Sequence, residues 1–244
     1  MPSSERMPDP SFRTTRWTLV LNAGTSTDES SRLALEDLCR TYWFPLYACA
    51  RRKGLEHNAA EDAVQGLFAG MLARGDIGRA DPDKGRFRAW LRTALEHHLA
   101  NLAKAKRADK RGGGATHVSL EMSGAAERYD SSAGAALSPE DLFDRTWALA
   151  LLDEALRELR SDYAGRDKAE LFDALAPTIT AGEEPLDRTA IAERFGMTDG
   201  ALKVAVHRLR ERYREVLRRN VIDTLEDPDA FEQELGALFA ALGG

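Results

Sequence analysis

Apolar residues recur at three- and four-residue spacing along almost the whole chain, and no other feature limits its fold as strongly. The stretch 198–219 shows the pattern at spacings of four, three, four and three. Its apolar positions are Leu202, Val206, Leu209, Tyr213 and Val216. Such spacing places side chains on one face of an α-helix, whereas a strand requires strict alternation. Because no alternating segment stands out, we predict an all-α fold.

The same periodicity predicts the individual helices. We expect them over 16–23, 30–54, 58–76, 86–111, 140–163, 166–180, 186–196, 198–219 and 225–244. Within the second of these, Pro45 is expected to cause a kink and Gly54 to end the helix. Asn58 followed by Glu61 resembles a capping box at the start of the next helix.

A stretch without helical periodicity divides the chain. Residues 112–138 are rich in Gly, Ala and Ser, a composition typical of a flexible linker. We therefore predict two helical domains that this linker joins. The expected segments are a flexible arm (1–15), a first domain (16–111), the linker (112–138), a second domain (139–225) and a helical tail (226–244). The tail shows one apolar stripe of Phe231, Leu235, Leu238, Phe239 and Leu242.

The sequence gives no support for a membrane protein, a secreted protein, a metalloprotein or an enzyme. The chain lacks an apolar run of about 18 residues and the apolar centre of a signal peptide, so we expect no membrane span and a cytoplasmic location. Cys39 and Cys49 are the only cysteines, and we expect no disulfide there. The five histidines are scattered. His57 and Glu61 lie one turn apart, but two ligands do not make a zinc site. No phosphate-binding loop is found, so we expect no metal, no cofactor and no enzyme.

The charge is distributed unevenly. The whole chain has a net charge of −6. Residues 83–111 nevertheless carry nine Lys/Arg against three Asp/Glu, and residues 188–219 carry nine against four. Two basic segments in an acidic protein suggest two contacts with a polyanion, although the charge alone is better explained by solvated helix faces.

The second basic segment has the pattern of a helix-turn-helix. A short helix with Ala190, Ile191 and Phe195 facing inward leads to a turn in which Gly196 is available for positive φ. Thr198 is a good N-cap for the basic helix that follows. In this motif the second helix enters the major groove. The predicted polar stripe is Lys203, His207, Arg210 and Arg214.

The first basic segment combines aromatic and basic residues. This mixture suits single-stranded DNA, because unstacked bases stack on aromatic rings. We interpret Phe87 as core, whereas Trp90 is equally compatible with core and with base stacking. The surrounding basic residues are Arg86, Arg88, Arg92, Lys104, Lys106 and Arg107.

Four segments, in order, resemble the extracytoplasmic-function group of bacterial sigma factors, which direct RNA polymerase to promoters. They are "YWFPLYACARRKG", "NAAEDAVQGLFAGML", "FRAWLRTALEHHLANLAKAKR" and "LDRTAIAERFGMTDGALKVAVHRLRERYREVL". The resemblance covers most of residues 16–219. The leading "RWTLVL", the long linker and the "DPDAFEQEL" tail resemble a subgroup from planctomycete-like bacteria. The family binds core RNA polymerase and promoter DNA, so the resemblance implies both as partners and transcription initiation as the function.

The resemblance also implies roles for particular residues. Polymerase contacts are expected on one helix, at Glu61, Asp62, Gln65 and Phe68. Bases of the downstream promoter element are expected to meet His97 and Asn101 beside Trp90. For the upstream element, the positions facing the groove are expected to be Ala201, Lys203, Ala205, His207 and Arg208. Thr198, Arg210 and Arg214 complete the predicted upstream contacts, and Arg210 and Arg214 are expected mainly to hold phosphates. Gly66 and Ala205 depart from the family, which usually has Glu and a basic residue there.

Two other functions remain open from the sequence. The chain could be a helix-turn-helix regulator of another type, although such proteins normally add a domain with strands. It could also be a sigma-like adaptor that binds a partner without initiating transcription. The sequence likewise leaves open whether an anti-sigma protein, a Ser/Thr kinase or the tail controls the activity.

Overall fold

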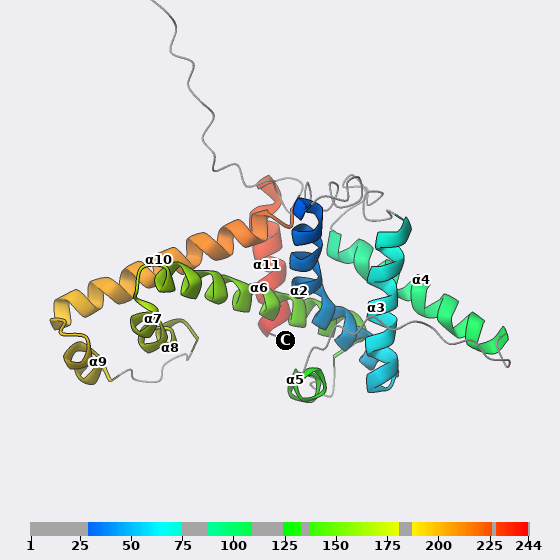
Figure 1. Cartoon of the computed structure of the whole chain (residues 1–244), viewed down its shortest axis with the longest axis horizontal. Helices are drawn as coiled ribbons and strands as arrows, with labels where there is room; N and C mark the ends of the chain where they lie inside the picture. Colours follow the sequence, from blue (N-terminus) through cyan, green and yellow to red (C-terminus); the bar gives the residue numbers. More distant parts are fainter. Residues whose placement is uncertain are drawn as a thin grey trace, which may run out of the picture. The chain divides into compact units, whose positions relative to one another are not determined.

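The structure, a computed structural model, describes residues 29–74, 87–108, 124–132, 137–180, 187–225 and 228–243. All regular secondary structure in these ranges is helical, which confirms the predicted all-α class for the described part of the chain (Figure 1). The helix predicted over 16–23 lies outside it. The chain forms two compact units, which are 1–143 with 222–231 and 144–221 with 232–244.

Three long helices pack together in the described part of the first unit. Helix α2 (Glu29–Arg52) packs on α3 (His57–Arg74) and on α4 (Phe87–Ala108), and α3 also packs on α4 (Figure 1). Rings join these helices: Tyr42 of α2 meets Phe87 of α4 edge to face with 5.4 Å between the centroids. The Tyr47 hydroxyl lies 2.7 Å from Nδ1 of His57 in a hydrogen bond that links α2 to the start of α3. Phe87 is buried, as predicted.

The helix ends in this unit follow from local hydrogen bonds. Helix α2 continues through Pro45 and is followed by Gly54, which has a φ of 94°. Left-handed backbone of this kind is open to glycine at no steric cost, so the predicted stop is confirmed. Helix α3 begins at His57, and the Ala60 amide donates to the Glu56 carbonyl at 2.9 Å. Asn58 therefore lies inside the first turn, and its predicted capping role is wrong.

Part of the predicted linker is a helix. Helix α5 (Ala125–Ser132) lies within 112–138 and contacts α2 through its side chains. The Arg128 guanidinium lies 4.3 Å from the centroid of the Phe44 ring, and Arg51 lies 5.0 Å from that of Tyr129. Cation–π contacts of this kind hold the segment on α2, and Ala125 at its start is buried. The prediction of a flexible linker is thus wrong for these residues.

Gly66 brings α3 and α4 close together. A Cβ at this position would lie 3.2 Å from Nε2 of His98 on α4. The His98 ring is partly buried, and burial, with the nearby Arg74 charge, lowers its pKa below the usual value. Both effects favour the neutral form of the imidazole. A larger side chain at position 66 would therefore crowd the His98 ring.

The second unit contains α6 (Pro139–Ala164) from Asp144 onward, followed by α7 (Ala169–Leu175), α8 (Pro177–Thr180), α9 (Arg188–Arg194) and α10 (Asp199–Ile222). Its hydrophobic core consists of Leu159, Phe172, Leu175, Leu202 and Leu209. These come from α6, α7 and α10, so the core joins the long helices to the short ones between them.

The predicted helical tail is present as α11 (Phe231–Gly243). The predicted apolar stripe of α11 is only partly buried: Leu238 is buried, whereas Phe239 is 61% exposed. Across the described ranges, none of the helices combines the length and the apolar content that crossing a membrane requires.

The contact at Gly66 can be tested against Gly70 on the same helix. Alanine in a helix interior is favoured over glycine by about 1 kcal/mol. At position 70 a Cβ meets only the end of the exposed Arg74 side chain, so Gly70→Ala should raise the free energy of unfolding. Gly66→Ala should give no such gain, because the His98 ring must move. Urea unfolding of both variants measures the difference.

A double-mutant cycle supplies the control. In a His98→Ala background the obstacle is gone, so Gly66→Ala should then stabilise by about 1 kcal/mol, as at an open site. An equal gain from Gly66→Ala with and without His98 would contradict the close contact.

Candidate nucleic-acid interface

The candidate site lies in the second unit, where α9 leads into α10. The carboxylate of Asp187 caps α9 by accepting a hydrogen bond from the Ala190 amide at 3.0 Å. Gly196 then turns the chain with a φ of 61°, and the Met197 amide donates to the Ala192 carbonyl at 2.8 Å. The short helix and the glycine turn predicted for a helix-turn-helix are therefore both present.

Thr198 begins the second helix of the motif. Its hydroxyl accepts a hydrogen bond from the Ala201 amide at 3.1 Å, and its carbonyl accepts one from the Leu202 amide at 2.9 Å. The side chain thus satisfies one of the amides that have no partner at a helix start. Asp199 follows in the first turn, and its hydrogen bond and charge interaction with Lys203 lower the pKa of its carboxyl. The predicted N-cap is confirmed.

The apolar stripe of α10 packs inward as predicted. Leu202, Leu209 and Val216 are fully buried, and Val206 and Tyr213 pack against the core around them. Ala205 is half-buried and packs against this core, because it follows Leu202 by three residues. It also lines a hollow beside α10, so its place facing the groove remains a prediction. On α9, Ile191 packs inward as predicted. Ala190 is exposed, and Ala192 packs against the core where Ala190 was expected.

His207 lies on the outer ridge of α10, between two hollows. One hollow, of about 910 Å³, extends from α10 to the turn between α6 and α7, and Arg208 lines it. The other, of about 310 Å³, lies on the side of α9. Its polar lining consists of Arg188, Lys203, His207, Arg210 and Arg214. The exposed half of the helix is thus a ridge with basic residues on both flanks.

Most of the predicted basic residues already have a partner within this unit. The ammonium of Lys203 lies 2.8 Å from the carboxylate of Asp199, and Arg214 lies 2.8 Å from Glu211. These pairs are exposed, so breaking them costs little. Arg210 differs, because its guanidinium donates two hydrogen bonds to the Thr178 carbonyl, at 2.9 and 3.2 Å. It ties α10 to the end of α8, and its role as a phosphate contact remains a prediction.

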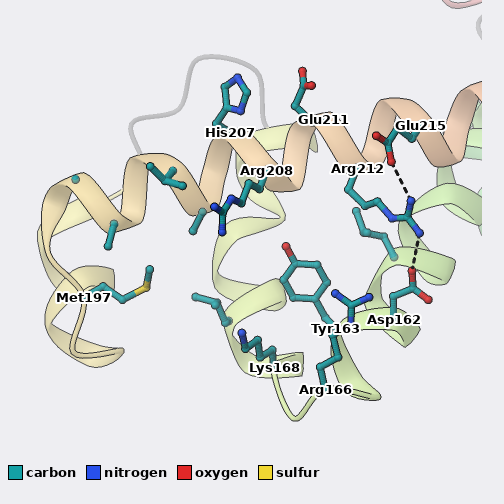
Figure 2. Close-up of a pocket in the computed structure, with 16 residues that line it drawn as sticks. Asp162, Tyr163, Arg166, Lys168, Met197, His207, Arg208, Glu211, Arg212 and Glu215 are labelled. Atoms are coloured by element: carbon teal, nitrogen blue, oxygen red, sulfur yellow. Dashed lines mark hydrogen bonds and ion pairs between the residues drawn. The ribbon is translucent and has the colours of Figure 1, made fainter.

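Two basic residues that line the site lie outside both basic segments identified in the sequence. Arg166 and Lys168, in the turn between α6 and α7, line the same hollow as Arg208 (Figure 2). They lie far from the helix-turn-helix in the chain, and only tertiary packing brings them to α10. The available signal was weak: two basic residues within three positions of Gly165, where a helix pattern ends.

In the first unit, the predicted DNA contacts divide between two faces of α4. Trp90, His97, Asn101 and Lys104 follow one another at spacings of seven, four and three, so they share one face. Trp90 is half-buried and stacks on Phe87, with 5.5 Å between the centroids, whereas the other three are exposed.

Arg88 lies on the other face of α4. It is 8% exposed, because its spacing of three from Leu91 places it on the buried stripe, so its expected surface contact with DNA is wrong. Arg92 is half-buried, and Lys106 is exposed. Arg86 and the side chain of Arg107 lie outside the described residues.

The predicted polymerase contacts on α3 are also exposed to different degrees. Asp62 is exposed, while Glu61 and Gln65 are half-buried. Glu61 lies 3.7 Å from Nε2 of His57. Phe68 is buried, since it follows Val64 by four residues on the core face, and its expected contact with a partner is wrong. In the part of the chain that the structure describes, no group of three or more His, Cys, Asp or Glu is arranged as for a metal ion.

Comparisons with family models, with curated proteins and with solved structures found no match to this chain.

The cap at Thr198 gives a direct test of how α10 begins. Thr198→Ala removes the hydroxyl that accepts from Ala201, and losing such a cap costs about 1 kcal/mol. The free energy of unfolding should fall by that amount in urea titrations. Thr198→Ser keeps the acceptor and serves as the control. Equal stability of the alanine and serine variants would contradict the capping role.

Proposed function

We propose that the chain is a sigma-type initiation factor, which binds core RNA polymerase and promoter DNA. One observation carries the DNA half of this proposal: a capped basic helix follows a glycine turn and exposes a ridge with basic residues on both flanks. A helix of this kind fits the major groove, where its first turns reach base edges and its flanks approach phosphates. The polymerase half is supported by the four ordered segments that resemble the family.

The first unit supports a contact with unpaired bases. His97 and Asn101 are exposed on the same face of α4 as the half-buried Trp90. Polar side chains beside an aromatic ring suit bases that have left the duplex, because the ring stacks on a base while hydrogen bonds read its edge. Lys104, further along this face, adds a positive charge for the backbone.

Two observable activities separate this proposal from its alternatives. A sigma-type factor supports a promoter-dependent run-off transcript when it is added to core polymerase. A regulator of another type binds duplex DNA without this activity, and an adaptor binds its partner without either. The decisive experiment therefore recovers core polymerase with the chain, sequences the bound DNA, and uses that DNA as the template for run-off transcription.

The ridge of α10 predicts two kinds of DNA contact. Lys203 lies in the first turns of the helix and is 61% exposed, so we expect it to contact base edges. Lys203→Ala should relax the preference for the upstream element by about 1–3 kcal/mol. Arg214 lies further along and should hold a phosphate. Arg214→Ala should therefore weaken all sequences alike and reduce the salt dependence of binding.

Titrations of matched and scrambled upstream elements at two salt concentrations distinguish these contacts. If both variants lose specificity equally, or neither loses any, then α10 does not lie in the groove in this way.

The exposed carboxylate of Asp62 tests the polymerase contact. Asp62→Lys should sharply reduce co-purification with core polymerase, and the double change Glu61→Lys with Asp62→Lys should abolish it. Glu127→Lys on α5 makes the same charge change at another exposed site and should have no effect. Circular dichroism verifies that helicity is retained. Full co-purification of the double variant would contradict the assignment of this surface to polymerase.

A further inference from the structure

The turn between α6 and α7 has a well-defined backbone. The Arg166 amide donates to the Tyr163 carbonyl at 3.1 Å, and the Lys168 amide donates to the same carbonyl at 2.9 Å. Asp167, between them, has a φ of 55° and lies in the left-handed region. Asp and Asn enter this region more readily than other side chains apart from glycine. The turn therefore holds Arg166 and Lys168 in fixed backbone positions.

Both side chains reach the larger hollow beside α10. Figure 2 shows Arg166 and Lys168 extending upward from the turn, while Arg208 extends from α10 toward them. Tyr163 lies between them, and its ring packs against Phe172 of the core, with 5.6 Å between the centroids. His207 and Glu211 point away on the outer side of α10 (Figure 2). Three basic side chains from two separate segments thus line one hollow together with the Tyr163 ring.

The acidic residues around this hollow are already engaged. Arg212 lies 3.6 Å from Asp162 and 2.9 Å from Glu215, and Arg214 pairs with Glu211. Within the described residues, by contrast, no ion pair joins Arg166, Lys168 or Arg208 to a carboxylate. The hollow therefore offers positive charge that the fold itself does not neutralise.

The position of His207 indicates which ligand would neutralise the positive charge of the larger hollow. This residue lines both hollows, so the ridge of α10 lies between them. When a helix enters the major groove, its ridge meets the base edges and the phosphates of the two strands lie along its flanks. A DNA strand that lies on the larger hollow would run between Arg208 and the turn that joins α6 to α7.

We propose that Arg166 and Lys168 form a clamp for the phosphates of one DNA strand, with Arg208 on its opposite side. This inference rests on the proposed placement of α10 in DNA and adds a contact outside the helix-turn-helix. The clamp supplies affinity without sequence preference, because phosphates are alike at every base pair. The turn thereby sets how deeply α10 enters the groove.

The test uses the full chain and short duplexes with matched and scrambled upstream elements. Each neutralised phosphate contributes about 0.9 to the slope of log affinity against log salt. The double change Arg166→Gln with Lys168→Gln should therefore reduce the slope by about 1.8 and weaken both duplexes alike. Asp167→Asn keeps a side chain that tolerates left-handed backbone and removes one negative charge, so it should strengthen binding to both.

Two controls separate the clamp from general charge and from folding. Arg157→Gln with Arg160→Gln removes the same charge from exposed positions on α6 outside the hollow, and it should leave the slope nearly unchanged. Arg166→Lys with Lys168→Arg keeps both charges and should retain the wild-type slope. Thermal unfolding of each variant shows whether the fold is intact.

The outcomes distinguish the clamp from the proposed function. If the wild-type chain binds DNA but the glutamine variant keeps its affinity and slope, the clamp is wrong and the placement of α10 stands. A change in preference between the two duplexes would also overturn the clamp, because it would indicate base readout. If the glutamine variant instead loses binding to inorganic phosphate or ATP and not to DNA, the hollow serves a small anion and the clamp is wrong. If the wild-type chain binds no duplex, both proposals fail.

Discussion

The packing of Leu202 and Leu209 against α6 and α7 is the interaction on which the candidate interface depends. Both side chains are fully buried, and burying a leucine contributes about 1.5–3 kcal/mol. Since the two residues lie seven apart on one face of α10, their burial sets the rotation of the helix about its axis. The opposite face then carries His207 as its ridge, with a basic flank on either side. The positions of these charges are thus a consequence of where the leucines lie.

The features that could be predicted from the sequence are those that depend on neighbouring residues. Helical spacing identified the buried stripe of α10, and it needed no knowledge of the partner surface. Thr198 and the glycines at 54 and 196 act within one turn of the chain, so their roles follow from local backbone chemistry. The all-α class belongs to the same group, because it is the sum of such local patterns.

The features that could not be predicted depend on contacts between distant segments. Helix α5 lies in a stretch whose composition favours no structure, and it is held by contacts of Tyr129 and Arg128 with α2, far away in the sequence. Phe68 and Arg88 are buried at helical spacing from Val64 and Leu91, but the family resemblance and the mixture of basic and aromatic residues had assigned these side chains to contacts with partners. The basic turn at Arg166 and Lys168 meets α10 through the core alone. Tertiary packing overrides composition at each of these positions.

The close approach at Gly66 also bears on how such a chain can diverge. The space that a side chain would need at this position is filled by the ring of His98. A related chain with a larger side chain at 66 is therefore expected to have a smaller residue at 98, or a wider spacing between α3 and α4. The two positions are expected to change together, although 32 residues separate them in the chain. Covariation between positions 66 and 98 would therefore reflect the close approach of α3 and α4.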